Sequence, residues 1–156
     1  MTALAPTRHL VCPDPDATSR LGAALASCAR AGDLICLWGD LGAGKTHLAK
    51  AFGAALGVAA TITSPSYILM AEYQGRLPLF HIDPYRLADA ADALEGGLID
   101  ERQADAVTLV EWPERLGAAL PAARLDVRID GVGEEPREVT IAAGSDAYRR
   151  YLDVVP

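Results

Sequence analysis

The order of apolar and polar residues predicts strands that alternate with helices. Two short runs, Leu34–Trp38 and Val107–Glu111, are mostly apolar, as is typical of strands buried on both faces of a sheet. Apolar and polar residues alternate over 125–129 and 138–141, and the glycines and proline of 131–136 between them predict a turn. The pattern therefore predicts interior strands in the first two thirds of the chain and a strand pair near its C-terminal end.

Helical spacing of apolar residues surrounds the first of these runs. Apolar residues at helical spacing predict one helix over 14–32, which begins with capping side chains and ends at a glycine. They predict a second helix over 45–57, which also ends at a glycine. Residues 87–105, broken by a glycine pair, and residues 147–154 predict two further helical stretches. Helices thus occur between the predicted strands along most of the chain.

A second strand pair follows the 45–57 helix. Residues 67–73 and 77–83 read as strands, and the Gln74-Gly75-Arg76 segment between them predicts a hairpin. A hairpin pairs its strands antiparallel, so the sheet should be mixed and only partly parallel. Strands alternating with helices predict a three-layer α/β fold around that central sheet, and 156 residues predict one domain over 1–156.

Composition and charge narrow the class of function. The chain is 51% hydrophobic and 22% charged, which is typical of a globular protein. Its formal net charge of −7 excludes a broadly basic surface that binds nucleic acid, including DNA, non-specifically. No apolar run is long enough to span a bilayer, and the N-terminal residues do not resemble a signal peptide. Three cysteines without metal-ligand spacing predict buried, reduced thiols. The expected location is cytoplasmic.

The segment 39–46 carries the strongest chemical signal. It fits G-x-x-x-x-G-K-[ST], the phosphate-binding loop (P-loop) of nucleotide-binding proteins, and it lies between a predicted buried strand and a predicted helix. Its glycines allow backbone N–H groups to converge on phosphate, and the helix N-terminus points its positive end at the same anion. After Gly39, the expected phosphate contacts are Asp40, Leu41, Gly42, Ala43, Gly44, Lys45 and Thr46, with the Thr46 hydroxyl available to Mg²⁺.

Two carboxylates end apolar runs, where a nucleotide site needs acidic side chains. Asp83 follows the 77–82 run and Glu111 ends the 107–111 run. A P-loop commonly requires such a carboxylate to hold Mg²⁺ or its water ligands, and the strand ends of an α/β sheet meet at one edge. His81 lies two residues before Asp83, so both side chains face the same side of a strand, where His81 could orient a carboxylate or a phosphate or could equally be a structural histidine with satisfied hydrogen bonds.

Other polar segments have both functional and structural interpretations. Ser64, Pro65, Ser66 and Tyr67 follow the P-loop helix, where nucleotide switches often lie, although Ser-Pro is also an ordinary turn. Arg86 and Arg137 are candidates for stabilising charge on a transferring phosphoryl group, or are surface arginines. Trp112 is either a core residue or an exposed contact.

Four segments taken in order resemble one family. They are 39–46, the Ser-Pro-Ser-Tyr of 64–67, the His-Ile-Asp-Pro-Tyr-Arg-Leu of 81–87 and the Val-Glu-Trp-Pro-Glu of 110–114. Together they are similar to the bacterial TsaE (YjeE) ATPases of tRNA threonylcarbamoyladenosine biosynthesis. The P-loop alone would not single out this family, whereas the ordered set of four is highly specific.

The resemblance implies roles for these residues. ATP would occupy the P-loop, Thr46 and Glu111 would hold Mg²⁺, and Asp83 would lie near the nucleotide and the metal. Lys45, Asp83 and Glu111 would then form the catalytic set.

The resemblance also bears on the remaining motifs. Residues 64–67 would act as a switch, Trp112 would lie beside the active site, and Arg137 matches a family arginine in the C-terminal hairpin. Ser66 stands where the family commonly has threonine but keeps the hydroxyl. Pro84 replaces a commonly aliphatic residue and removes one backbone donor.

The partners implied by the resemblance are a TsaB–TsaD heterodimer and, only through that complex, tRNA. In that system TsaD transfers threonylcarbamoyl onto adenosine 37 of the tRNA, and ATP hydrolysis by TsaE-like subunits resets the complex between turnovers. A chain of this kind would hydrolyse ATP weakly alone and faster with its partner.

Three other functions fit a P-loop. A small-metabolite kinase usually closes an arginine-rich lid, whereas 87–105 carries only Arg102. A GTPase normally has an Asn-Lys-x-Asp segment, in which neither Lys45 nor Lys50 stands. A non-catalytic nucleotide-sensing module would not need Lys45, Thr46, Asp83 and Glu111 together. These alternatives stay open on the sequence alone.

Overall fold

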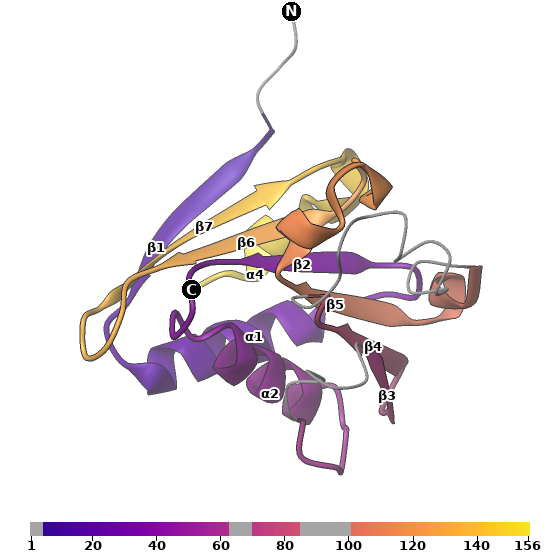
Figure 1. Cartoon of the computed structure of the whole chain (residues 1–156), viewed down its shortest axis with the longest axis horizontal. Coiled ribbons are helices and arrows are strands. Elements are labelled where there is room, and N and C mark those ends of the chain that lie inside the picture. The colour runs from indigo at the N-terminus through magenta and orange to yellow at the C-terminus, as the bar shows by residue number, and fades with distance from the viewer. Residues whose placement is uncertain (1–4, 63–69, 85–100) are drawn as a thin grey trace, which may run out of the picture.

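The computed structural model describes residues 5–62, 70–84 and 101–156, which form helices packed on a central sheet (Figure 1). The strands are β1 Thr7–Cys12, β2 Leu34–Trp38, β3 Met70–Gln74, β4 Pro78–Ile82, β5 Val107–Glu111, β6 Leu125–Asp130 and β7 Arg137–Ala143. The α-helices are α1 Pro15–Ser27, α2 Lys45–Ala55 and α4 Arg150–Val154, and short 3-10 helices cover Glu101–Asp105, Pro113–Arg115, Gly117–Ala119 and Asp146–Tyr148.

The sheet is mixed, as the sequence predicts. Its strand order is β1-β7-β6-β2-β5-β4-β3, in which β2 pairs in parallel with β5 and β6, and β4 pairs in parallel with β5. β3 is antiparallel to β4, and β7 is antiparallel to both β6 and β1. The carboxyl ends of β2, β4 and β5 therefore lie at one edge, where an α/β sheet binds its ligands.

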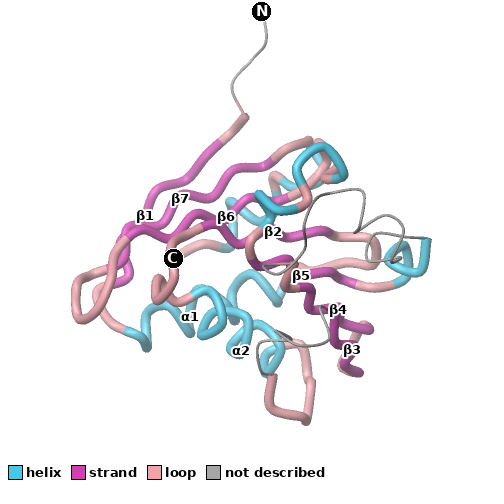
Figure 2. Tube along the Cα trace, in the orientation of Figure 1, coloured by secondary structure: helices cyan, strands magenta, loops and turns pink. Residues whose placement is uncertain are grey.

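Packing on both faces explains why β2 and β5 are almost continuously apolar. Ile35 and Leu37 of β2 point into the core beneath the helices, while Leu34 and Cys36 point into a second core that contains Leu116. Figures 1 and 2 show α1 and α2 side by side on one face of the sheet. Both faces of the central strands are thus shielded from water.

Helix boundaries follow from local hydrogen bonds. The Asp14 carboxylate accepts a bond of 2.8 Å from the backbone N–H of Ala17, which caps α1. The helix ends at Ser27, earlier than the 14–32 spacing predicts, because the Asp33 carboxylate accepts from the N–H of Arg30 and fixes a turn before β2. α2 begins at Lys45 directly after Gly44, as expected.

Some elements differ from the sequence-based expectations. β1 is an additional strand, and the predicted 147–154 helix starts as the 3-10 turn Asp146–Tyr148 before α4. Of the predicted 87–105 helix, only the 3-10 helix Glu101–Asp105 falls within the described residues. All three thiols are free, with Cys12 and Cys36 buried and Cys28 half-buried. In the described ranges no helix has the length and apolar character needed to cross a bilayer.

Candidate functional site

The candidate site is built where three parallel strands end. β2 leads into the P-loop, β4 leads to Asp83, and β5 ends at Glu111. β5 is the neighbour of both β2 and β4, so the sheet itself brings the P-loop and the two carboxylates together. This arrangement is the one that the sequence predicts for Asp83 and Glu111.

The P-loop has the backbone geometry that phosphate binding requires. Gly42 and Gly44 have φ values of 83° and 110°, in the region that favours glycine, and Gly44 is the residue before the first turn of α2. A Cβ atom built at either glycine would meet no atom within 4 Å, so the backbone there borders open space. At Gly39, a Cβ atom would lie 2.6 Å from the carbonyl oxygen of Ile129. Only glycine fits at that entry to the loop.

Lys45 is buried beside the loop and is held by two neighbours. Its side chain donates a 2.6 Å hydrogen bond to the carbonyl oxygen of Gly39, and its Nζ lies 3.3 Å from the centroid of the Trp112 ring. Burial lowers the pKa of the Lys45 ammonium, and the carboxylates of Glu111, Glu114, Asp83 and Asp40 oppose that shift. Asp83 itself is buried directly after β4.

Trp112 adopts an unusual backbone conformation next to Glu111. Among the described residues it is the one non-glycine with positive φ, at φ 52° and ψ 50°. For an L-residue this left-handed conformation costs about 1–2 kcal/mol. It turns the chain at the end of β5 and lets the indole cover Lys45.

Glu111 links the P-loop helix to β4. One of its carboxylate oxygens, Oε1, accepts a 2.9 Å hydrogen bond from the Thr46 hydroxyl, and the other, Oε2, lies 2.6 Å from Nε2 of His81. Both Glu111 and His81 are buried. The pair of hard oxygen donors, the Thr46 hydroxyl and the Glu111 carboxylate, is suited to Mg²⁺.

Arg137 holds the P-loop against the β6–β7 hairpin. Its Nε donates to the carbonyl oxygen of Ala43 at 2.9 Å, and its Nη2 reaches the carbonyl oxygens of Gly42 at 3.3 Å and Gly133 at 2.9 Å. Its Nη1 donates to the carbonyl oxygen of Glu135. Arg137 therefore lies at the loop, and its contacts are with backbone carbonyl groups.

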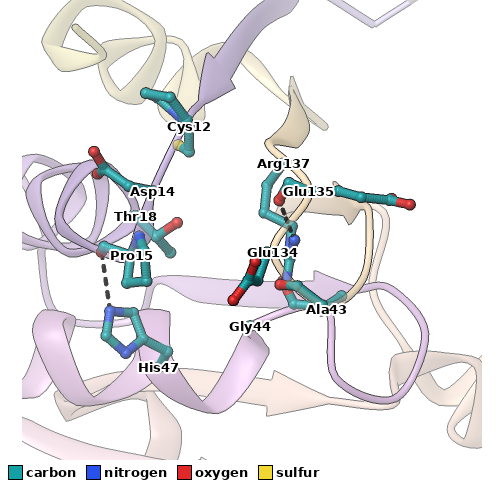
Figure 3. Close-up of a pocket in the computed structure, with 12 residues that line it drawn as sticks. Cys12, Asp14, Pro15, Thr18, Ala43, Gly44, His47, Glu134, Glu135 and Arg137 are labelled. Atoms are coloured by element: carbon teal, nitrogen blue, oxygen red, sulfur yellow. Dashed lines mark hydrogen bonds between the residues drawn. The ribbon is translucent and has the colours of Figure 1, made fainter.

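A cavity of about 510 Å³ opens beside the P-loop. Figure 3 shows the start of α1 and His47 along one side, and Arg137 with the hairpin along the other. Its lining comprises Cys12, Pro13, Asp14, Pro15, Thr18, Ala43, Gly44, His47, Gly133, Glu134, Glu135 and Arg137. Its volume lies in the range of small-ligand pockets.

Most of this lining is missing from the sequence-based site. His47 immediately follows the P-loop threonine, and its Nε2 lies 3.0 Å from the carbonyl oxygen of Pro15, to which it donates. The position of His47 next to Thr46 in the sequence was the signal from which its place in the cavity could have been predicted. No sequence signal places Cys12 and Glu134 at the cavity, because they reach it only through the way β1 and the hairpin pack around the P-loop.

In the structure, contacts link Thr46, Glu111 and His81 to one another and Lys45 to Trp112, all at the start of α2 and the end of β5. Arg137 binds the backbone of the P-loop nearby. Asp40 and Leu41 lie on the exposed tip of the loop, where Leu41 is 82% exposed. The predicted switch residues Ser64, Pro65, Ser66 and Tyr67, and also Arg86, lie outside the described residues.

Comparison with known proteins gives a consistent family. The family model described as threonylcarbamoyl adenosine biosynthesis protein TsaE matches residues 12–139. The tRNA threonylcarbamoyladenosine biosynthesis protein TsaE of Bacillus subtilis is 38% identical over 136 residues, which cover 86% of this chain and 85% of that protein. The TsaE of Streptomyces coelicolor is 41% identical over 128 residues, covering 78% and 86% respectively.

A solved structure has the same fold. The crystal structure of YdiB from Bacillus subtilis superposes with a TM-score of 0.79 at 30% identity, and the match covers 99% of this chain and 97% of that one. With the mixed sheet of seven strands in the described residues, this similarity confirms the predicted α/β fold, which is P-loop NTPase-like.

Proposed function

Since this chain belongs to the TsaE family and takes part in tRNA threonylcarbamoyladenosine biosynthesis, we propose that its role there is to bind and hydrolyse MgATP. The observation that carries the proposal is the 2.9 Å hydrogen bond between Thr46 and Glu111 at the start of the P-loop helix. It joins the hydroxyl of the phosphate-binding motif to the strand-end carboxylate that such sites use.

The donor set at this position fits Mg²⁺. Mg²⁺ in nucleotide sites is commonly held by one or two protein oxygens, with phosphate oxygens and water completing its coordination. Within the described ranges no cluster of three histidine, cysteine or acidic residues is present that could form an all-protein metal cage. Thr46 and Glu111 would hold the ion, which supplies charge neutralisation to the phosphates when it is bound.

The cavity beside the loop supports the placement of the nucleoside. Phosphates bound on the N–H groups of 42–46 would leave the α-phosphate end of the nucleotide facing the cavity lined by Pro13, His47 and the hairpin. About 510 Å³ is sufficient for a base and a ribose. We therefore place the adenosine of ATP between α1 and the β6–β7 turn (Figure 3).

Each residue of the site then has a stated task. Lys45 leaves the carbonyl oxygen of Gly39 and the Trp112 ring to donate to the phosphates. Glu111 would hold the metal and orient the attacking water, and the charge of Asp83 would act as a second carboxylate of the site. Arg137 keeps the carbonyl groups of Gly42 and Ala43 fixed, so that the neighbouring N–H groups stay aimed at phosphate.

The proposed partner is a TsaB–TsaD heterodimer, and tRNA is reached only through it. In the described part of the chain, the guanidinium of Arg137 is hydrogen-bonded to backbone carbonyl groups around the P-loop, so it is engaged in holding the loop. The arginine that stabilises the transferring phosphoryl group is therefore proposed to come from the partner. An arginine supplied in trans accelerates comparable phosphoryl transfers by roughly 10³–10⁵. We propose that the isolated chain hydrolyses ATP slowly and that the heterodimer accelerates it, which cycles the complex between turnovers.

Two substitutions test the binding and turnover roles separately. Lys45→Ala should raise the Kd for MgATP at least about tenfold, because a buried ammonium donor to phosphate is lost. Glu111→Gln should lower kcat by on the order of 10²-fold, since it removes the charge that orients metal and water, and it should also lose part of the affinity gained on adding Mg²⁺. Calorimetric binding and a phosphate-release assay measure the two quantities.

The chain offers matched controls for both substitutions. Lys50→Ala changes the other lysine, which is exposed on the same helix, and Asp153→Asn changes an exposed carboxylate of α4. Both controls should retain the parent Kd and kcat. Equal losses in Lys45→Ala and Lys50→Ala, or unchanged turnover in Glu111→Gln, would contradict the proposed site.

A further inference from the structure

His81 is a buried histidine with a single hydrogen-bonding role in the described structure. Its side chain is 0% exposed, and its Nε2 lies 2.6 Å from Oε2 of Glu111. Its other ring nitrogen, Nδ1, has no hydrogen-bond partner among the described residues. Histidines buried for structural reasons generally satisfy their polar atoms. Among the described residues, the contact with Glu111 is thus the one hydrogen bond of the imidazole.

The sheet register explains why the two side chains meet. His81 of β4 pairs with Leu109 of β5, and Glu111 lies two residues farther along β5, on the same face. A carboxylate can only accept, so Nε2 carries the hydrogen and donates a hydrogen bond to Oε2. The second oxygen, Oε1, then remains directed at the Thr46 hydroxyl, 2.9 Å away.

We infer that His81 is a positioning residue for the metal site. By binding Oε2, it fixes the Glu111 carboxylate in the rotamer that presents Oε1 beside Thr46, where the metal would be held. Histidine and carboxylate groups behind a metal ligand commonly orient it in this way, and their loss costs about 10–100-fold in metal affinity or activity. This inference rests on the proposed function, because it assigns His81 to the same MgATP site.

Two substitutions of His81 separate a donor to Glu111 from simple packing. Glutamine can place its amide N–H near the position of Nε2, whereas the shorter asparagine can reach only the position of Nδ1. His81→Asn should keep ATP binding in EDTA within about twofold of the parent but lose at least about tenfold of the affinity gained on adding Mg²⁺. His81→Gln should recover most of that gain. Calorimetric titration of ATP with and without Mg²⁺ measures both.

The fold of each variant is checked first by a cooperative urea transition. If His81→Asn does not fold, His81→Phe takes its place, since phenyl fills the space of the imidazole without a donor, and the same loss of the Mg²⁺-dependent gain is expected. A kcat that falls in parallel with that gain, at unchanged EDTA binding, would further support positioning.

The possible failures are distinguishable. A parent protein whose ATP affinity does not change with Mg²⁺ would overturn the proposed function, and the inference with it. A parent with a clear Mg²⁺ effect that His81→Asn retains would overturn the role of His81 alone. The role of His81 would also be overturned if both His81→Asn and His81→Gln lost ATP affinity equally in EDTA and in Mg²⁺. That result would reflect a loss of packing.

Discussion

Arg137 illustrates how a single residue couples two parts of the site. Its guanidinium donates to carbonyl oxygens of Gly42 and Ala43 in the P-loop and of Gly133 and Glu135 in the hairpin. A planar guanidinium can serve several acceptors at once in a fixed geometry, which an ammonium group cannot. The residue therefore acts on nucleotide binding through the backbone of the loop.

We expect Arg137→Lys to raise the Kd for MgATP about three- to tenfold, because the lysine keeps the charge but cannot bridge both segments. The measurement is calorimetric titration at constant ionic strength. The matched control is Arg128→Lys, which alters an exposed arginine of the same strand pair and should leave the Kd unchanged. An unchanged Kd in Arg137→Lys would show that the charge alone suffices.

The sequence predicts the residues of the site better than their contacts. Motif spacing selected Lys45, Thr46 and Glu111 as candidates. Strand periodicity placed His81 on the side of Asp83, whereas its hydrogen bond is with Glu111. The contact between Lys45 and the Trp112 ring depends on a left-handed turn at Trp112, which is not a residue that favours this conformation. Such a turn is imposed by tertiary packing, so it leaves no local signal.

At the scale of elements, the close packing of α1 on α2 fixes the helix that follows the P-loop. Gly22 of α1 lies so close to α2 that a Cβ atom there would be 2.9 Å from the carbonyl oxygen of Leu48 and 3.0 Å from Cβ of Ala51. Both contacted residues belong to the helix that begins at Lys45. The absence of a side chain at Gly22 thus sets the position of the P-loop helix.

Gly22→Ala should therefore destabilise the protein, although alanine is normally better than glycine inside a helix by about 1 kcal/mol. The contact with backbone on α2 has to be relieved by moving one helix, which costs more than the gain in propensity. Urea unfolding measures the change. Ala23→Gly, at the adjacent exposed position, gives the local size of the propensity effect. Stabilisation by Gly22→Ala equal to that effect would contradict the packing argument.

The elements that sequence patterns predict well are those whose environment is uniform. β2 and β5 coincide with the predicted runs because both faces of each strand are buried. β1 was missed because it is an edge strand with largely exposed side chains, and it pairs with β7, which is far away in the sequence. Its pairing is determined by a distant partner that local periodicity does not reveal.

For the whole molecule, a buried polar network attaches the C-terminal helix to the start of β2. Asp33 accepts hydrogen bonds from Arg150 and Tyr151, and the Tyr148 hydroxyl accepts from the N–H of Leu34 at 2.8 Å. Burial raises the pKa of the Tyr148 and Tyr151 hydroxyls, and it raises the pKa of the Cys36 thiol from 9.0 to about 12. Several acidic groups are thus held in their neutral forms by the fold.

These shifts predict a loss of stability at alkaline pH. A group whose pKa is higher in the folded state stabilises fully below its unfolded pKa, and that contribution disappears as the pH rises toward the folded value. For Cys36 the window runs from about pH 9 to about pH 12. Lys45, whose pKa is lowered by burial, acts in the opposite direction, but it is one group against the three thiols and two tyrosines with raised pKa values.

The free energy of unfolding from urea titrations should therefore fall steadily across that window. Cys36→Ala should make the decline shallower because it removes one of the titrating groups. The two slopes are compared, so any constant cost of the substitution cancels. A free energy of unfolding that is independent of pH above about pH 9 would contradict the assignment.

The most direct test of the account is ATP hydrolysis by the purified chain with and without a TsaB–TsaD heterodimer, with GTP and a panel of metabolite acceptors as controls. The account predicts slow release of phosphate by the chain alone, at least about tenfold stimulation by the heterodimer, and loss of both activities in Glu111→Gln. Full-speed hydrolysis that the heterodimer leaves unchanged, or transfer of phosphate to a metabolite, would contradict a partner-dependent ATPase.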